Sequence, residues 1–218
     1  MNVKIKICCI SSIEEAFTAI EYGASALGLV SKMPSGPGVI SDETIRKIAD
    51  TIPPSIASFL LTSETDSKSI IQHQKIVATN TIQIVDELKS GEYEEMKLAL
   101  PGIKIVQVIH VIGNESIARA ISISKHVDGI LLDSGNPNLK IKELGGTGRQ
   151  HDWEISRKIR NSVEVPIFLA GGLNVDNVAQ AIKTVRPFGV DVCSGVRTNG
   201  KLDTVKLETF ILAVQNSN

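Results

Sequence analysis

The chain has 218 residues, 42% of them hydrophobic, which is enough for one α/β barrel or at most two small domains. Its formal net charge of −1 gives no reason to expect nucleic acid or an anionic membrane surface as a partner. No run approaches the roughly 18 apolar residues of a membrane span, and the N-terminus enters a strand pattern without a secretion signal, so we expect a cytoplasmic protein.

Short runs rich in valine and isoleucine alternate with amphipathic segments along the whole chain. The runs predict strands at 3–10, 26–30, 55–61, 81–85, 104–111, 129–133, 165–171 and 189–195. The segments between them predict helices at 12–22, 41–51, 66–78, 91–99, 114–125, 152–162, 174–185 and 203–215. Eight strand–helix pairs in alternation require parallel strands and predict a single (β/α)₈ barrel domain over residues 1–218.

Local signals at the helix ends agree with this division. Ser12 and Glu15 have the spacing of a capping box at the start of the first helix, and Gly23 stands where a helix ends. Asn174 and Asp203 are suitable N-caps for the last two helices. These positions therefore fix the predicted boundaries of the first, seventh and eighth helices.

The three cysteines are Cys8, Cys9 and Cys193. An odd number in a reducing compartment argues against a disulfide framework, and four scattered histidines give no zinc-ligand spacing, so we expect no metal site. Core packing and chemistry remain as the two interpretations of the adjacent pair. Side chains alternate along a strand, so one of the two should face the barrel mouth and the other the helices; Lys6 shares the face of Cys8, where a cation favours the thiolate.

Active sites of such barrels lie at the carboxyl ends of the strands. Polar residues or glycines stand at the ends of the first, sixth, seventh and eighth predicted strands: Cys8, Cys9, Asp133, Gly171, Gly172, Asp191, Cys193, Ser194 and Gly195. Glycines after the last two strands favour a bound phosphate, although tight turns would also use glycine. The longest predicted loop, 134–151, carries a second glycine cluster at 145–148, and long ordered loops in barrels commonly bind ligands.

These stretches resemble the phosphoribosylanthranilate isomerase family of tryptophan biosynthesis over the full length of the chain. The resemblance is carried by "KICCI", "EYGASALGLV", "LLDS", "GGTGRQHDW", "FLAGGLNVDNVAQAI" and "VRPFGVDVCSGV". It implies an Amadori rearrangement of N-(5'-phosphoribosyl)anthranilate to the carboxyphenylamino-deoxyribulose 5-phosphate, by acid–base catalysis and without a metal or organic cofactor. The implied substrate is thus a small phosphorylated sugar, and we expect the enzyme to be a monomer or a homodimer.

The resemblance also assigns site residues by position. It implies Cys8 as the general base and Asp133 as the general acid. It implies phosphate binding by Gly146, Gly171, Gly172, Ser194 and Gly195, and further substrate contacts from Lys6 and Asp191. Cys9 takes the place of a family glycine, and we expect both Cys9 and Cys193 to be packing residues, with Cys193 near enough to approach Cys8.

The chain departs from the family pattern where the anthranilate should bind. Gly38 occupies the position of the arginine that binds the substrate carboxylate, and Val85 that of a histidine. Lys32, Arg149 and Arg197 are the candidate replacement cations. Two alternatives therefore remain open: an isomerase of the same mechanism acting on another phosphosugar adduct, or a non-catalytic barrel that binds a phosphorylated ligand.

Overall fold

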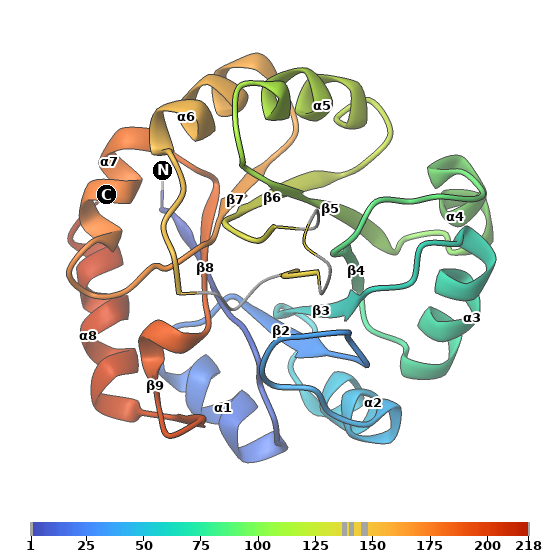
Figure 1. Ribbon diagram of the computed structural model, residues 1–218. Helices are drawn as coiled ribbons and strands as arrows, with labels where there is room; N and C mark the ends of the chain where they lie inside the picture. The colour runs from blue at the N-terminus through green and yellow to red at the C-terminus, as the bar shows by residue number, and fades with distance from the viewer. Residues whose placement is uncertain (1, 137–138, 140–141, 145–147, 218) are drawn as a thin grey trace.

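The computed structural model describes residues 2–136, 139, 142–144 and 148–217. Eight parallel strands close into a barrel in the order β1 to β8, and helices surround it (Figure 1). The strands are β1 Lys4–Ile7, β2 Ala26–Val30, β3 Ala57–Thr62, β4 Thr81–Ile84, β5 Lys104–His110, β6 Gly129–Asp133, β7 Ile167–Leu169 and β8 Gly189–Val192. The helices are α1 Ile13–Tyr22, α2 Asp42–Thr51, α3 Ser67–Val77, α4 Tyr93–Ala99, α5 Glu115–Ile123, α6 Trp153–Ser162, α7 Val178–Val185 and α8 Thr204–Gln215.

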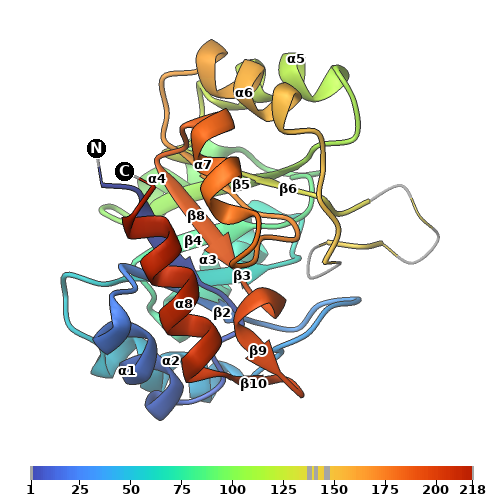
Figure 2. The same ribbon diagram turned by 90° about the vertical axis from the view of Figure 1, so that its left-hand side faces the viewer.

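After β8 the chain forms a short 3₁₀ turn, η1 Ser194–Val196, and a small hairpin, β9 Arg197–Thr198 with β10 Lys201–Leu202 (Figure 2). The predicted (β/α)₈ architecture is thus confirmed. None of the described helices has both the length and the apolar character needed to span a bilayer.

Most of the predicted helix ends are also observed. The Ser12 hydroxyl accepts the Glu15 amide at 3.2 Å, and Gly23 ends α1 at a φ of 114°, in the left-handed region. The expectation that Asn174 caps α7 was wrong. Its carbonyl accepts the amides of residues 177 and 178, and this turn delays the helix until Val178. In the sequence, an asparagine whose backbone carbonyl closes a turn before a helix looks the same as an asparagine whose side chain caps the helix.

The apolar residues form two separate cores. The larger lies between the strands and the helices, and the smaller fills the barrel interior with residues such as Phe59, Val106, Leu131 and Phe168. Inward-facing side chains of the barrel strands form this interior, as expected for an eight-stranded barrel. The smaller core closes the floor of the barrel, so polar groups at the carboxyl ends of the strands lie above an apolar base.

The barrel closes where the first strand pairs with the last. Lys6 lies in register with Asp191, and Ile7 with Val192. Since every other neighbouring pair of strands is consecutive in the chain, this seam is the one junction in the barrel that joins distant residues, Lys6 and Asp191 being 185 positions apart. Its position makes it the place where the N- and C-terminal parts of the chain meet.

Candidate active site

A cavity opens at the carboxyl ends of the strands, with about 720 Å³ of space that includes solvent at its open mouth. Six of the residues expected in the site line it: Cys8, Asp133, Gly171, Gly172, Asp191 and Ser194. Gly195 lies behind this lining, and Gly146 falls outside the described residues. The strand ends therefore bring together most of the groups that were singled out from the sequence.

Lys6 lies beneath the cavity and is completely buried. Its ammonium forms an ion pair with Asp191 at 2.9 Å and lies 5.1 Å from the centre of the Phe59 ring. Burial by itself lowers the pKa of Lys6, but Asp191 and Cys8 outweigh this effect and raise the pKa above its usual value. A lysine with an aspartate partner in this setting stays protonated.

Gly28 on β2 makes room for both Cys8 and Lys6. A Cβ atom at this position would lie 2.8 Å from the Cys8 sulfur and 3.0 Å from the Lys6 ammonium. The side chains of Cys8 and Lys6 therefore both lie over Gly28, which confirms that they extend from the same face of β1. The thiol of Cys8 is held between a buried cation and the open cavity.

Asp133 ends β6 and is only 8% exposed. Its Oδ1 accepts the Ser134 amide at 2.7 Å. Burial raises the pKa of the Asp133 carboxyl, while His110 and the Ser134 amide oppose the rise without cancelling it. A buried carboxyl of this kind can hold a proton at a higher pH than an exposed one, as a general acid must.

His110 stands beside Asp133, because the two residues are in register on β5 and β6. Its Nε2 donates to the Val85 carbonyl at 3.0 Å, which leaves Nδ1 as the unprotonated nitrogen. This Nδ1 is buried and has no hydrogen-bond partner in the described part of the chain. Sequence reasoning missed His110, although a polar residue at the end of a buried strand was an available signal.

Gln83 was also missed, and it lines the cavity from β4. It is 3% exposed, and its Oε1 is a buried acceptor without a partner among the described residues. Buried polar atoms are nearly always hydrogen-bonded in folded proteins. An unpaired acceptor on the cavity wall marks a position where a ligand hydroxyl could donate.

The loops after β7 and β8 pack closely together. Gly171 and Gly172 have φ values of 82° and 65°, which glycine adopts without strain. A Cβ on Gly171 would lie 3.0 Å from the Ser134 amide, and one on Gly195 would lie 2.2 Å from the Leu173 carbonyl. Glycine is therefore required here by both conformation and space, and bare backbone is left facing the cavity.

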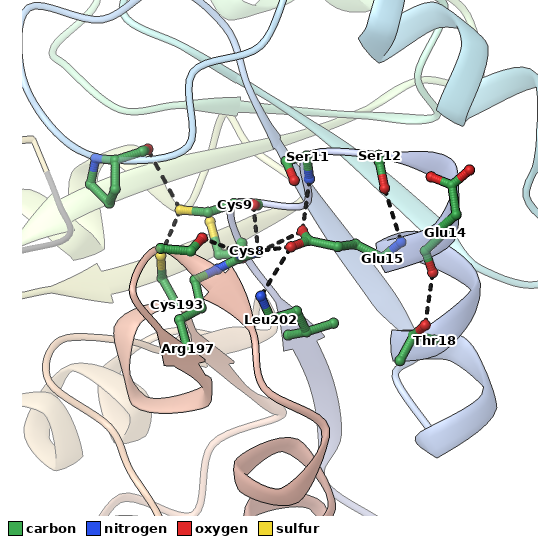
Figure 3. Close-up of polar contacts among 12 residues, drawn as sticks. Cys8, Cys9, Ser11, Ser12, Glu14, Glu15, Thr18, Cys193, Arg197 and Leu202 are labelled. Atoms are coloured by element: carbon green, nitrogen blue, oxygen red, sulfur yellow. Dashed lines mark hydrogen bonds and ion pairs between the residues drawn. The ribbon is translucent and has the colours of Figure 1, made fainter.

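Cys9 and Cys193 pack against apolar residues as expected, but they do so in the barrel interior and not between β1 and the helices. Cys9 has a φ of 63°, in the left-handed region, so the strand alternation that would turn it towards the helices has already ended. Its sulfur meets that of Cys193 at 2.6 Å, and both residues line the cavity beside Cys8 (Figure 3). Cys193 thus approaches Cys9 rather than Cys8.

Arg197 is buried near these thiols, and both terminal nitrogens of its guanidinium donate hydrogen bonds. Its guanidinium donates to the carbonyls of Cys8 at 3.3 Å and Cys9 at 2.5 Å, and to both oxygens of Glu15 at 3.1 Å (Figure 3). Burial opposes ionisation of Glu15, but the bonds from Arg197 and two amides lower its pKa below the usual range. Arg197 therefore fastens the backbone after β1 to the segment after β8.

The other candidate cations lie away from the cavity. Lys32 is exposed, and Arg149 forms an ion pair with Glu143. Neither of them lines the cavity, and no described lysine or arginine does. Gly38, at the expected arginine position, has a φ of 79°, and a Cβ there would lie 2.5 Å from that of Cys9. The backbone at this position excludes a side chain.

The half of the cavity away from the glycine loops is apolar. Its lining comes from the ends of β2, β3 and β4 and from the loop after β6: Val30, Met33, Leu61, Val85 and Leu144. Among the described residues, no group of three or more histidine, cysteine or acidic side chains is arranged to hold a metal ion. The site thus combines two buried carboxyls, three thiols, a glycine-lined end and an apolar end.

A closed parallel barrel with its polar cavity at the carboxyl ends of the strands defines the class of (β/α)₈-barrel enzymes. The sequence profile of the N-(5'-phosphoribosyl)anthranilate isomerase family matches residues 5–213. N-(5'-phosphoribosyl)anthranilate isomerase 1 of Methanosarcina mazei is 34% identical over 231 aligned positions, which cover 100% of this chain and 97% of that protein. The chain belongs to this family of isomerases.

Solved structures agree with this assignment. A monomeric form of the dimeric phosphoribosylanthranilate isomerase of Thermotoga maritima has a TM-score of 0.79 and 27% identity, covering 98% of this chain and 99% of that one. A phosphoribosylanthranilate isomerase bound to reduced 1-(o-carboxyphenylamino)-1-deoxyribulose 5-phosphate has a TM-score of 0.77 and 29% identity, with the same coverage. Fold and sequence therefore indicate the same enzyme family.

Proposed function

We propose that this enzyme rearranges N-(5'-phosphoribosyl)anthranilate to 1-(o-carboxyphenylamino)-1-deoxyribulose 5-phosphate, with Asp133 as general acid and Cys8 as general base. The observation that carries these roles is that a carboxyl with a raised pKa and a thiol beside a buried lysine line one cavity. Family membership supports the reaction and, with it, a cytoplasmic setting.

The reaction needs one proton delivered and one removed. Asp133 donates its proton to the ring oxygen of the sugar, and the ring opens to a Schiff base between C1′ and the anthranilate nitrogen. The Cys8 thiolate then removes the proton from C2′, which gives an enolamine that tautomerises to the ketose. Lys6 and Asp191 support this step from below, since their ion pair keeps a positive charge beside the thiol.

The two ends of the cavity suit the two ends of the substrate. Bare backbone at Gly171 and Gly172, together with Ser194 and the closely packed Gly195, is suited to binding the 5'-phosphate. The apolar end suits the aromatic ring of the anthranilate. A single barrel domain covering the chain is sufficient for this function, as a monomer or as a homodimer like that of the Thermotoga maritima relative.

One observation favours a second candidate function, the same rearrangement on a phosphosugar adduct that lacks the carboxylate. No described lysine or arginine lines the apolar end, so a carboxylate there would lack a charged partner in this part of the chain. A buried, unpaired carboxylate costs several kcal/mol. Comparing KM for the anthranilate adduct and the corresponding aniline adduct decides between the two, since only the second candidate predicts tighter binding of the aniline adduct.

Substitution at the two proposed catalytic positions tests the mechanism. Cys8→Ser and Asp133→Asn should each lower kcat by about 10² to 10⁴-fold, the usual contribution of a positioned acid or base. Cys9→Ala is the matched control, because it removes the adjacent thiol, and it should keep kcat within a few-fold of wild type. Full activity of Cys8→Ser in a steady-state assay with N-(5'-phosphoribosyl)anthranilate would contradict the assignment of the base.

A further inference from the structure

We propose that Cys9 and Cys193 form a redox-active pair, which closes to a reversible disulfide at the seam between β1 and β8 and lowers activity. The two residues follow the first and the last strand of the barrel, so the bond would join distant parts of the chain. Neither thiol has a part in the proposed rearrangement. The inference therefore concerns a modification site that the catalytic mechanism leaves unexplained.

The geometry is close to that of a disulfide. The two sulfurs are 2.6 Å apart, and a disulfide bond is about 2.05 Å long, so they need to approach by only about 0.5 Å. Cys9 is 5% exposed, while Cys193 is partly exposed and both line the open cavity. A small oxidant can therefore reach the pair from the cavity mouth.

The two thiols are also electronically different. The interactions with Cys193 and Cys8, together with burial, raise the pKa of Cys9. The interaction with Cys9 lowers the pKa of Cys193, and the nearby Arg197 guanidinium adds to this lowering while burial opposes it. Cys193 therefore forms a thiolate more readily than Cys9, and it is the more accessible of the two. Both properties make it the attacking group.

The oxidant is a low-molecular-weight disulfide, of which oxidised glutathione is the probe. The Cys193 thiolate attacks one sulfur of the probe, so the probe's S–S bond breaks and one reduced thiol leaves. Cys9 then gives up its proton and attacks the Cys193 sulfur of the mixed disulfide, releasing the second reduced thiol. Overall, two protein thiols are oxidised to one disulfide, and one small disulfide is reduced to two thiols.

Loss of activity follows from the backbone that Cys9 shares with Cys8. Arg197 holds the carbonyls of both residues, and Cys9 packs tightly against Gly38. Drawing the Cys9 sulfur towards β8 by about 0.5 Å therefore shifts the peptide that positions Cys8. Since a displacement of about 1 Å at a reacting group can cost about 10²-fold in rate, we expect kcat/KM to fall by about ten-fold.

The test oxidises the full-length enzyme with excess oxidised glutathione and measures its intact mass, its peptide map and its activity. We expect a protein lighter by two hydrogen atoms, about ten-fold lower kcat/KM, and recovery of both on adding dithiothreitol. Cys193→Ser should show neither change, whereas Cys9→Ser should stop at the mixed disulfide with glutathione and should not lose two hydrogen atoms. Trypsin leaves Cys8 and Cys9 on one peptide, so the peptide map alone does not show which of them is bridged. The variant Cys8→Ser should still form the bridge to Cys193, and this result assigns the bridge to Cys9.

Three results would overturn the proposal. These are a wild-type mass that keeps both hydrogens under oxidised glutathione, a bridge that disappears in Cys8→Ser, or an oxidised enzyme with unchanged kcat/KM. The first two are read from mass alone, so they hold whichever substrate the enzyme uses. A failure of the proposed function would instead appear as inactivity of the reduced wild-type enzyme.

Discussion

Replacing Asp191 by asparagine removes one charge of the buried ion pair while preserving the size of the side chain. Lys6 is 0% exposed and its only ion-pair partner among the described residues is Asp191, at 2.9 Å. Breaking a buried pair from one side costs about 3–5 kcal/mol, because the remaining charge is left without compensation. We therefore expect Asp191→Asn to lower the free energy of unfolding by about this amount.

The same loss of unfolding free energy can be expressed as a fall in melting temperature, Tm. Unfolding entropy is about 2.1 cal/mol/K per residue near 60 °C, so 218 residues give about 0.46 kcal/mol/K. A loss of about 3–5 kcal/mol then lowers Tm by about 7–11 °C. Urea unfolding followed by far-UV circular dichroism measures the free energy, and a thermal scan measures Tm.

The pH dependence of this loss identifies Lys6 as its origin. In wild type the pKa of Lys6 is raised above 10.5, so its stabilising contribution is complete below that pH and is lost only as pH rises through the higher, folded-state value. Without Asp191, burial lowers the pKa of Lys6 in the folded state below its unfolded-state value of 10.5. At a pH between these two pKa values, the unfolded state binds more protons than the folded state. The deficit of the variant should therefore shrink between about pH 7 and about pH 10.

An exposed ion pair provides the control. Arg46 and Asp50 lie one turn apart on α2 with side chains 47% and 55% exposed, so Asp50→Asn should cost less than about 1 kcal/mol. The reasoning is refuted if Asp191→Asn costs no more than Asp50→Asn. A deficit that stays the same across the pH range would show that the uncompensated charge is not that of Lys6.

Gly171→Ala should raise KM by about ten-fold or more, because it strains a φ of 82° and places a Cβ 3.0 Å from the Ser134 amide; an unchanged KM would contradict the phosphate assignment. Gly38→Arg should destabilise the fold and not restore carboxylate binding, since its Cβ would lie 2.5 Å from that of Cys9; a lower KM with unchanged Tm would disprove this. Activity should fall as pH rises through the pKa of Asp133, which is raised above that of an ordinary carboxyl, and this alkaline limb should be absent from the residual activity of Asp133→Asn.

The strands and helices could be predicted because their signals are local. Runs such as 104–111 and 129–133 are apolar and β-branched, and each barrel strand needs only its own residues to be recognised. The positions of Cys8 and Asp133 at strand ends followed from the same patterns. Their shared cavity followed from the rule that active sites of such barrels lie at the carboxyl ends.

What could not be predicted depends on contacts across the barrel. Cys9 leaves the strand alternation through one left-handed φ, and nothing in its neighbours signals this. Arg197 looked like a free cation because its partner, Glu15, lies about 180 positions away in the sequence. His110 gains its relation to Asp133 only through the register of β5 and β6, which becomes known once the sheet is formed.

The seam also bears on how the chain is made. Lys6 and Glu15 leave the ribosome early, while their partners Asp191 and Arg197 are among the last residues to appear. At about 5–20 residues per second, about 10–40 s pass between the synthesis of Lys6 and that of Asp191. During this time Lys6 cannot be buried without a large cost, because its charge has no partner. A nascent fragment that closed early would bury this unpaired charge, so Lys6 disfavours closure of the barrel before β8 has been made.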